Sequence, residues 1–461
     1  MIIYELIRQI GEVLWGGVGL AFMLGVGVYF TLRLRFAQVR ALPLIIKRTL
    51  GSLFVKDNGK GRRVSPFSAL CTALAASVGV GNIAGVATAL TLGGPGAVFW
   101  MLVASVLGMA TAYAENYLGI LYRVPLRGGG YTGGAMYCLR DGVGGRAGKC
   151  LGALFAFFCV MASLGMGNMS QVNTLTVNFT SAFGIRALAG REIAGVDLYS
   201  VICGAGVCLA AGIAIFAGMG RILRITERVV PFIVILYTLG CIAVLFAYRE
   251  NLVSAIGSVF KHAFSLEGVY GGVGGYSIRE VVVCGVKRGV FSNEAGLGST
   301  VCIGASAEVD SAEEQGMWGM LNVFIDTVVM CTLTALTVLC SGLIDLQSGR
   351  MLTDSDSAAL VSEVFGSIFG RWGSGFIAVC IVLFAFSTVL GWSVYGVNCF
   401  VYLFGERRAN IYRAVYVAFI FIGAVAPLTA VWEMSDSFNA LMMVPNLMGL
   451  IFLRKKVTSL K

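Results

Sequence analysis

Runs of about twenty apolar residues recur along almost the whole chain, and they restrict its fold more than any other feature. A helix needs roughly 20 apolar residues to cross the hydrocarbon layer of a bilayer. Eleven such runs are present, at positions 13–32, 66–91, 97–121, 151–182, 198–217, 229–248, 280–304, 317–343, 374–404, 411–430 and 434–453. The sequence therefore predicts an all-α polytopic membrane protein with eleven transmembrane helices, of which 280–304 is the least hydrophobic.

The composition agrees with a membrane protein and argues against a soluble one. Hydrophobic residues make up 57% of the chain and charged residues 13%, whereas soluble domains have roughly 45–50% and about 25%. The first run is preceded by Glu5, Arg8 and Glu12 and lacks a small-residue cleavage site, so we expect a retained helix and not a signal peptide. The net charge of +10 lies mostly in loops between apolar runs, and we expect no nucleic-acid partner.

Lys and Arg are distributed unevenly over the predicted loops. One set of alternate connections carries 24 of the 34 cations, in the segments 33–63, 123–149, 221–228, 407–413 and after 453. The other set carries seven, namely Arg8, Arg186, Arg191, Arg249, Lys261, Arg350 and Arg371, and the remaining three, Arg279, Lys287 and Arg288, lie around the 280–304 run. Because cytoplasmic loops are enriched in Lys and Arg, this asymmetry predicts that the N-terminus lies outside and the C-terminus in the cytoplasm.

Cysteine and histidine usage argues against a metal centre and against an enzyme. The thirteen cysteines lie mostly in apolar runs without a C-x-x-C pair, and His262, predicted in an outer loop, is the only histidine. Buried, reduced cysteines that act as small hydrophobic residues are the favoured interpretation, and a zinc site is disfavoured. The stretch DGVGGRAGKC, Asp141 to Cys150, departs from the P-loop pattern, so we expect neither an organic cofactor nor catalytic residues.

A short motif occurs twice at equivalent places. SVGVGNIAGVATAL begins at Ser77, near the start of the second run, and VFSNEAGLGSTV begins at Val290, in the least hydrophobic run; both contain N-x-A-G. Setting the first helix aside, each motif lies on the first helix of a group of five. Since five is odd, the groups enter the membrane from opposite sides, which predicts an inverted repeat with a substrate site at its two interrupted helices. The expected parts are 1–64, an extra helix with a basic segment, 65–248, the first repeat, and 249–461, the second repeat with a basic tail.

The glycines around both motifs predict breaks in the helices. Glycine inside a helix costs about 1 kcal/mol relative to alanine, and unwound backbone is not tolerated against lipid. An unwound segment facing a cavity offers N–H groups to a carboxylate and carbonyl oxygens to a cation such as sodium. Close helix packing is the alternative reading, and we favour it for Gly85 or Ala89 taken alone.

Some polar side chains are expected at bilayer depth. A charge there costs ~2.5–3.5 kcal/mol on insertion scales and is usually functional. For Glu294, ligand contact, gating, proton transfer and a structural hydrogen-bonded carboxyl all remain open. Glu115 and Asp326 are interpreted as buried structural partners, and Trp392 as packing or a gate.

Several stretches resemble the alanine or glycine:cation symporter family, also called sodium:alanine symporters. They run in order from Gly79 to Gly396 and include GVGNIAGVATALTLGGPGAVFWMLVASVLGMATAYAE, GGAMYCLR, GNMSQVN, RGVFSNEAGLGS and FAFSTVLGWSVYG. The resemblance implies a multi-pass carrier of a bacterial or archaeal plasma membrane with the LeuT-like five-plus-five inverted-repeat fold. It also implies symport of a small neutral amino acid, of the alanine or glycine type, with sodium.

The resemblance also implies site residues. The substrate pocket would be formed by the first break, one residue of the third core helix and the second break, namely Gly79, Val80, Gly81, Asn82, Gln171, Phe291, Ser292, Asn293 and Glu294. The amino acid's carboxylate would lie at the N–H groups of GVGN, and its ammonium group would face the FSNE carbonyls and Gln171. Sodium would be bound by the carbonyls of Ala75 and Val78 and the hydroxyls of Ser387 and Thr388.

Two departures from the family pattern bear on this reading. Val80 replaces a threonine common in the family, and Gly304 replaces a histidine common after the second break. Alternatives to sodium-coupled alanine or glycine transport are coupling to protons, a different small amino acid and, less favoured, a channel, since one inverted repeat does not provide the equivalent subunits from which filters are built.

Overall fold

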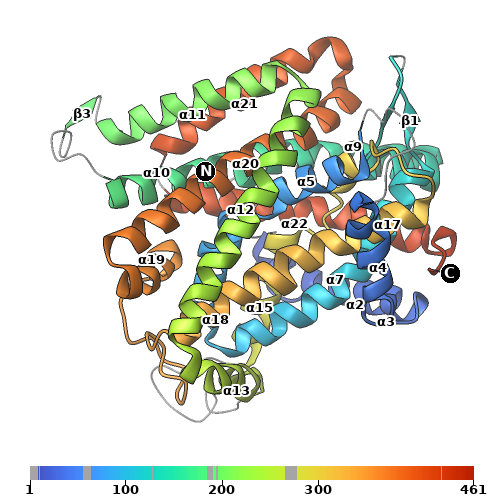
Figure 1. Cartoon of the computed structure of the whole chain (residues 1–461). Helices are drawn as coiled ribbons and strands as arrows, with labels where there is room; N and C mark the ends of the chain where they lie inside the picture. Colours follow the sequence, from blue (N-terminus) through green and yellow to red (C-terminus); the bar gives the residue numbers. More distant parts are fainter. Residues whose placement is uncertain are drawn as a thin grey trace.

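The computed structural model describes residues 9, 11–54, 64–126, 128–183, 191–193, 196–264, 278–426 and 428–460. This part of the chain is mostly helical, as predicted (Figure 1). Two short antiparallel hairpins, β1 (Val124–Pro125) with β2 (Tyr131–Thr132) and β3 (Glu192–Ile193) with β4 (Val196–Asp197), lie in connections between helices.

The helices follow one another in two series. The first contains α2 (Val18–Arg33), α3 (Ala37–Arg40), α4 (Leu42–Arg48), η1 (Leu50–Phe54), α5 (Pro66–Ser77), η2 (Val80–Asn82), α6 (Ala84–Gly93), α7 (Gly96–Leu121), α8 (Ala135–Tyr137), η3 (Cys138–Val143), α9 (Gly145–Leu164), η4 (Gly165–Met169), α10 (Ser170–Phe183), α11 (Leu198–Phe216) and α12 (Met219–Ala247). The second contains η6 (Arg249–Asn251), α13 (Leu252–Ala263), α15 (Ile278–Asn293), α16 (Val301–Gly304), α17 (Ala312–Val323), η7 (Phe324–Cys331), α18 (Thr332–Cys340), α19 (Ser357–Phe369), α20 (Arg371–Phe404), η8 (Glu406–Arg408), α21 (Ala409–Val425), α22 (Leu428–Phe452) and η9 (Arg454–Lys456).

Seven helical stretches within the described residues are long and apolar enough to cross a membrane, and one bent pair makes an eighth. The seven are α7, the continuous run from α9 to α10, α11, α12, the run from α17 to α18, α20, and η8 with α21. Of the other predicted spans, α2 and α15 have 16 residues each and α22 has 25. The structure thus gives seven or eight spans by length and composition, and the count of eleven stays a prediction.

The first predicted break is present. Helix α5 starts with Pro66 after Ser65, whose hydroxyl accepts the Ser68 amide proton, and it ends at Ser77. Gly79 is extended, and the chain then makes the short η2 before α6 begins. The two parts, Pro66–Ser77 and Val80–Gly93, are bent by 61°.

The second predicted break follows α15. Helix α15 ends at Asn293, and the next residue, Glu294, has a φ of 59°. Gly296 and Gly298 also have positive φ values, 90° and 75°. Left-handed backbone favours glycine because a Cβ would crowd the carbonyl oxygen, so these glycines permit the turn before α16 begins.

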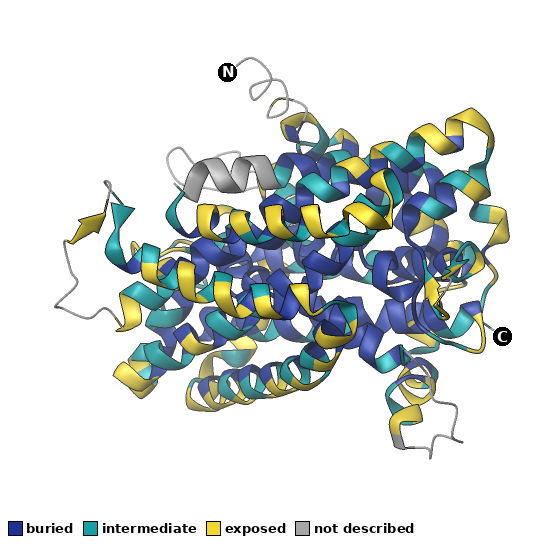
Figure 2. Cartoon of the chain, turned by 90° about the horizontal axis from the view of Figure 1, so that it is seen from above, coloured by how far each residue is buried: buried dark blue, intermediate teal, exposed yellow. Residues whose placement is uncertain are grey.

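The interrupted helices lie inside the protein and the regular ones surround them. Helix α15 packs against α6 and α7, and α5 packs against α12 and α20. Helices α11 and α21 pack against each other at the periphery, where their outward faces are exposed (Figure 2). The unwound backbone is therefore covered by protein, as the absence of hydrogen-bond partners in lipid requires.

The connections gather at two ends of the molecule. Figure 1 places α13 and α19 at one end and β1, α4 and the C-terminus at the opposite end. These groups correspond to the cation-poor and cation-rich connections of the sequence.

The prediction for His262 was wrong in one respect, because it belongs to the last turn of α13 and not to a loop, with its Nε2 atom 3.1 Å from the Leu346 carbonyl oxygen.

Candidate functional site

The two breaks meet in the centre of the helix bundle. The short turn η2 contacts α15, and a Cβ placed on Gly81 would lie 3.7 Å from the Phe291 ring and 3.8 Å from the Ser292 Cα atom. Asn82, Asn293 and the other side chains predicted for the pocket are at most 2% exposed. The structure thus brings together two segments that are more than two hundred residues apart in the sequence.

Side-chain oxygens accept hydrogen bonds from the backbone amides that lose their helical partners at the first break. Asn82 Oδ1 accepts the Gly79 amide proton at 2.9 Å, and Gln171 Oε1 accepts that of Val80 at 3.2 Å. These two amides therefore do not close the α-helical bonds to the carbonyls of Ala75 and Ala76. Gln171 is held from its other end, since Nε2 donates to the Met166 carbonyl at 3.1 Å.

Asp326 connects the two breaks. It is fully buried in η7, where the helix widens to π geometry, and its Oδ1 accepts a proton from Asn82 Nδ2 at 2.9 Å. Thr327 donates to Asp326 Oδ2 at 2.7 Å and accepts from Asn293 Nδ2 at 3.0 Å. One carboxylate and one hydroxyl therefore hold the asparagines of both N-x-A-G motifs, which confirms Asp326 as a buried structural partner, although the sequence did not identify its partners.

Glu294 faces its own loop. Its Oε2 accepts a proton from Ser299 Oγ, while its Oε1, buried, has no hydrogen-bond partner among the described residues. A second buried carboxylate, Glu115 of α7, accepts from Asn446 Nδ2 at 2.6 Å, and that amide also donates to the Gly296 carbonyl at 2.9 Å. Two carboxylates thus border the second break, and the indole N–H of Trp392, which has no other partner among the described residues, faces the carboxylate of Glu294.

The predicted sodium ligands lie where α20 crosses the end of α5. A Cβ on Gly391 would lie 2.7 Å from the Ala76 nitrogen, so the two helices touch through this glycine. One turn earlier, Thr388 Oγ1 is buried without a hydrogen-bond partner among the described residues and would lie 2.5 Å from a Cβ on Gly79. Ser387 Oγ donates to the Phe384 carbonyl at 2.9 Å, which leaves its lone pairs available.

Gly304 stands where a larger side chain would not fit. A Cβ at this position would collide with Asn116 Oδ1 and would lie 2.9 Å from Gln315 Nε2. The space beside α16 is therefore filled by two amides from α7 and α17.

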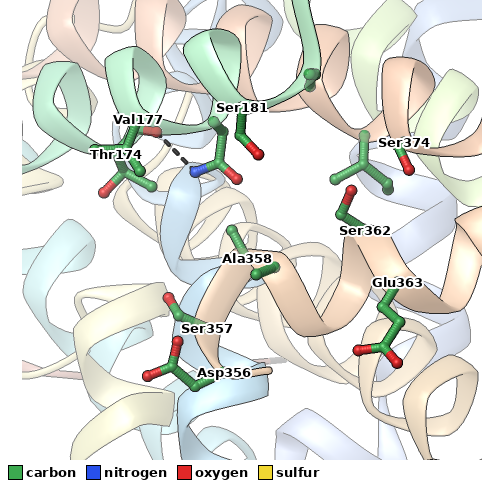
Figure 3. Close-up of a pocket in the computed structure, with 14 residues that line it drawn as sticks. Thr174, Val177, Ser181, Asp356, Ser357, Ala358, Ser362, Glu363 and Ser374 are labelled. Carbon is green, nitrogen blue, oxygen red and sulfur yellow. Dashed lines mark hydrogen bonds between the residues drawn. The ribbon is translucent and has the colours of Figure 1, made fainter. Parts of the chain in front are cut away.

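A pocket lined by several hydroxyl and carboxylate side chains lies outside the predicted site, at one end of the molecule. It has a volume of ≈ 450 Å³ between α10, α19 and α20. Figure 3 shows Ser181, Ser362 and Ser374 around it, with the carboxylates of Asp356 and Glu363 at α19. Thr174, on its α10 wall, is one helical turn beyond Gln171. The predicted pocket residues do not line it, and because their side chains are at most 2% exposed, the predicted site is closed to solvent in this structure.

Comparisons with known proteins agree over the full length of the chain. Residues 1–461 match the model of the sodium:alanine symporter family. The chain is 39% identical to "Sodium/alanine symporter AgcS" of Methanococcus maripaludis over 99% of this chain and 96% of that protein. It is 34% identical to "Probable sodium/glutamine symporter GlnT" of Bacillus subtilis over 100% of this chain and 90% of the relative.

A solved structure shares the fold. "Crystal structure of MhsT in complex with L-phenylalanine" superimposes with a TM-score of 0.59 over 86% of this chain and 89% of that one, at 15% identity. At this identity the likeness concerns the helix arrangement alone. It agrees with the LeuT-like architecture expected from the sequence.

Proposed function

This chain belongs to the sodium:alanine symporter family, whose members are amino-acid transporters and not enzymes, and from that premise we propose that it carries a small neutral amino acid of the alanine or glycine type into the cell together with sodium. The observation that carries the proposal is the meeting of two interrupted helices in a buried centre. Amide groups and carbonyls of such breaks suit the carboxylate of an amino acid and a hard cation.

The amino acid's carboxylate would bind at the amide of Val80. Gln171 Oε1 holds that amide at 3.2 Å in the closed conformation, and a carboxylate oxygen is a stronger acceptor than an amide oxygen. Substrate binding would therefore displace Gln171 Oε1, which frees Gln171 to face the ammonium group together with carbonyls of the 291–294 segment. Buried Val80 adds no hydroxyl to the pocket.

Sodium would bind between α5 and α20. Thr388 Oγ1 has no partner within the described residues, and the Ala75 carbonyl has lost its α-helical partner because the Gly79 amide bonds to Asn82. Hard cations prefer such oxygen ligands. With Ser387 Oγ and the Val78 carbonyl these groups come from both helices, so a bound ion would hold α5 against α20.

The gradients available are sufficient for uptake against a concentration difference. One monovalent cation crossing ~100 mV releases ~2.3 kcal/mol, and a tenfold gradient of the cation adds ~1.4 kcal/mol. At ~1.4 kcal/mol per decade, these could concentrate a neutral solute several hundredfold. We place the protein in a bacterial or archaeal plasma membrane with its N-terminus outside, as an extra helix followed by repeats over 65–248 and 249–461.

The proposal is tested in proteoliposomes that contain the purified protein. We expect uptake of alanine or glycine that depends on an inward sodium gradient and is lost in Asn82→Ala, because this change removes the acceptor of the Gly79 amide and the donor to Asp326. Asn410→Ala, at an exposed position at the start of α21, is the matched control. Uptake driven equally well by a proton gradient without sodium would overturn the coupling.

A competition panel of amino acids in the same assay decides the substrate. We expect alanine and glycine to compete better than glutamine, the substrate named for the Bacillus subtilis relative. Counterflow of labelled against unlabelled amino acid identifies a carrier, and single-channel currents would identify a channel.

A further inference from the structure

Three cysteines from separate helices meet in the protein interior. The Sγ atoms of Cys159 (α9), Cys302 (α16) and Cys399 (α20) all lie within 4.8 Å of one another, and those of Cys302 and Cys399 are 3.9 Å apart. None of the three residues is exposed to solvent. They are separated by 143 and 97 residues in the sequence, so no short metal-binding motif of the sequence predicts the cluster.

The separation of the sulfurs matches that of ligands around one ion. A thiophilic ion such as Zn²⁺ lies roughly 2.3 Å from each coordinating sulfur, and three sulfurs around it in a plane are then ~4 Å apart. A further soft donor is close by, since a Cβ on Gly134 would lie 2.5 Å from Met136 Sδ and 3.1 Å from Cys302 Sγ. From this geometry we propose that Cys159, Cys302 and Cys399 form a binding site for a thiophilic d¹⁰ metal ion.

The buried setting decides the charge state of the site. A net charge is costly in the interior, and a divalent ion is neutralised by two thiolates. Two S–H bonds therefore break as two metal–sulfur bonds form, two protons leave to the buffer, and the third thiol coordinates through a lone pair while it keeps its proton. Soft sulfur ligands select against sodium, magnesium and calcium.

A cleft at the surface is lined by residues that are close in the sequence to the cluster. An open cleft of ≈ 740 Å³ lies at the β1–β2 end of the molecule and is lined by Tyr137 and Val401. Val401 is two residues from Cys399, and Tyr137 is the neighbour of Met136.

Such an ion would fix the helix that follows the second break. Asn398 Nδ2 already donates to the Cys302 carbonyl at 2.8 Å, which joins α20 to α16. The ion would add bonds from Cys302 to both α9 and α20. On the proposed function, these bonds would stop the second break from moving and would inhibit transport.

Cadmium titration of the purified protein, monitored by the sulfur-to-cadmium charge-transfer absorbance, tests the site directly. We expect saturation at one ion per chain, with two protons released, and at least tenfold weaker binding in Cys302→Ala and Cys159→Ala. The double variant Cys241→Ala with Cys380→Ala removes two other buried thiols, on α12 and α20, and should bind cadmium like the unmodified protein. Unchanged binding in Cys302→Ala would overturn the proposal.

Two further measurements keep the test decisive if a variant fails to fold. Cys399→His keeps a metal ligand and should retain cadmium binding that Cys399→Ala loses. Cadmium-113 NMR of the unmodified protein should show a sulfur-rich site, and a resonance of oxygen ligation would contradict the cluster. Cadmium that binds but leaves sodium-driven uptake unchanged would refute only the inhibition, and absent uptake without cadmium would refute only the proposed function.

Discussion

Gln171 holds the Val80 amide that the proposed substrate carboxylate would use. Because Nε2 is fixed by the Met166 carbonyl, the side chain presents Oε1 to the first break. A neutral amide oxygen is a weak competitor that an ionised carboxylate can displace. On the proposed function, this arrangement would satisfy the buried Val80 amide between transport cycles and would leave it available when substrate arrives.

Gln171→Glu tests this exchange. The variant keeps the size of the side chain but places an acidic group beside Val80, which competes with and repels the substrate carboxylate. We expect the KM of sodium-driven uptake to rise about tenfold or more, equivalent to ~1.4 kcal/mol of binding, with a smaller change in maximal rate. Gln347→Glu, in an exposed loop, is the matched control. An unchanged KM would place the carboxylate elsewhere.

The sequence predicts the positions of some residues of the site but not the contacts that these residues make. Gly79 and Asn82 could be predicted as part of a break because glycines and a repeated motif disturb an apolar run. The bonding of Asn82 to Asp326 could not, because it depends on a π-helical widening 244 residues later in the chain. The cluster of Cys159, Cys302 and Cys399 likewise depends on tertiary packing alone, although the prediction that most cysteines are buried and free is confirmed.

At the scale of helices, Gly391 sets the distance between α20 and α5. A Cβ at this position would lie 2.7 Å from the Ala76 nitrogen and 2.9 Å from the Ala76 Cβ. The two helices are the ones that carry the proposed sodium ligands. Cation ligands must be within a few tenths of an ångström of their positions, so the close approach at Gly391 is a condition for the proposed site.

Gly391→Ala should therefore weaken sodium binding. The added methyl group forces α20 away from α5, at a cost of about 1–3 kcal/mol for overpacking, and separates Thr388 from the end of α5. We expect the half-saturating sodium concentration for uptake to rise at least fivefold. Gly206→Ala in α11 adds the same methyl group where nothing lies within 4 Å and should have no effect. Equal sodium dependence in both variants would contradict the assigned ligands.

At the scale of the whole molecule, the lengths of the apolar runs predict where the helices lie, and the distribution of Lys and Arg predicts which end faces the cytoplasm. The long apolar runs correspond closely to helices, because a run of that length has few other ways to satisfy its backbone in lipid. Helix α15 is poorly indicated by hydrophobicity, because it carries Arg279, Glu280, Lys287 and Arg288. It is covered by other helices. Lys287 forms an ion pair with Asp436 of α22 at 2.6 Å, so part of the charge on α15 is neutralised by another helix of the protein. Composition could not reveal that pairing.

The uneven distribution of Lys and Arg predicts which end faces the cytoplasm, and Cys150 allows this to be measured. It is the exposed cysteine among thirteen, and it lies in the second turn of α9, directly after the cation-rich segment 123–149. A membrane-impermeant maleimide should leave Cys150 unlabelled in intact cells and label it in inside-out vesicles. Buried thiols react slowly because they do not ionise in apolar surroundings, so the nine buried cysteines contribute little signal, and the half-buried Cys203, Cys208 and Cys284 are replaced by alanine in the labelled protein. In a Cys150→Ser background, Ser348→Cys introduces an exposed thiol in the loop after α18, in the cation-poor set, and should give the opposite pattern. Labelling of Cys150 in intact cells would invert the topology and, with it, the direction in which the proposed sodium site meets the gradient.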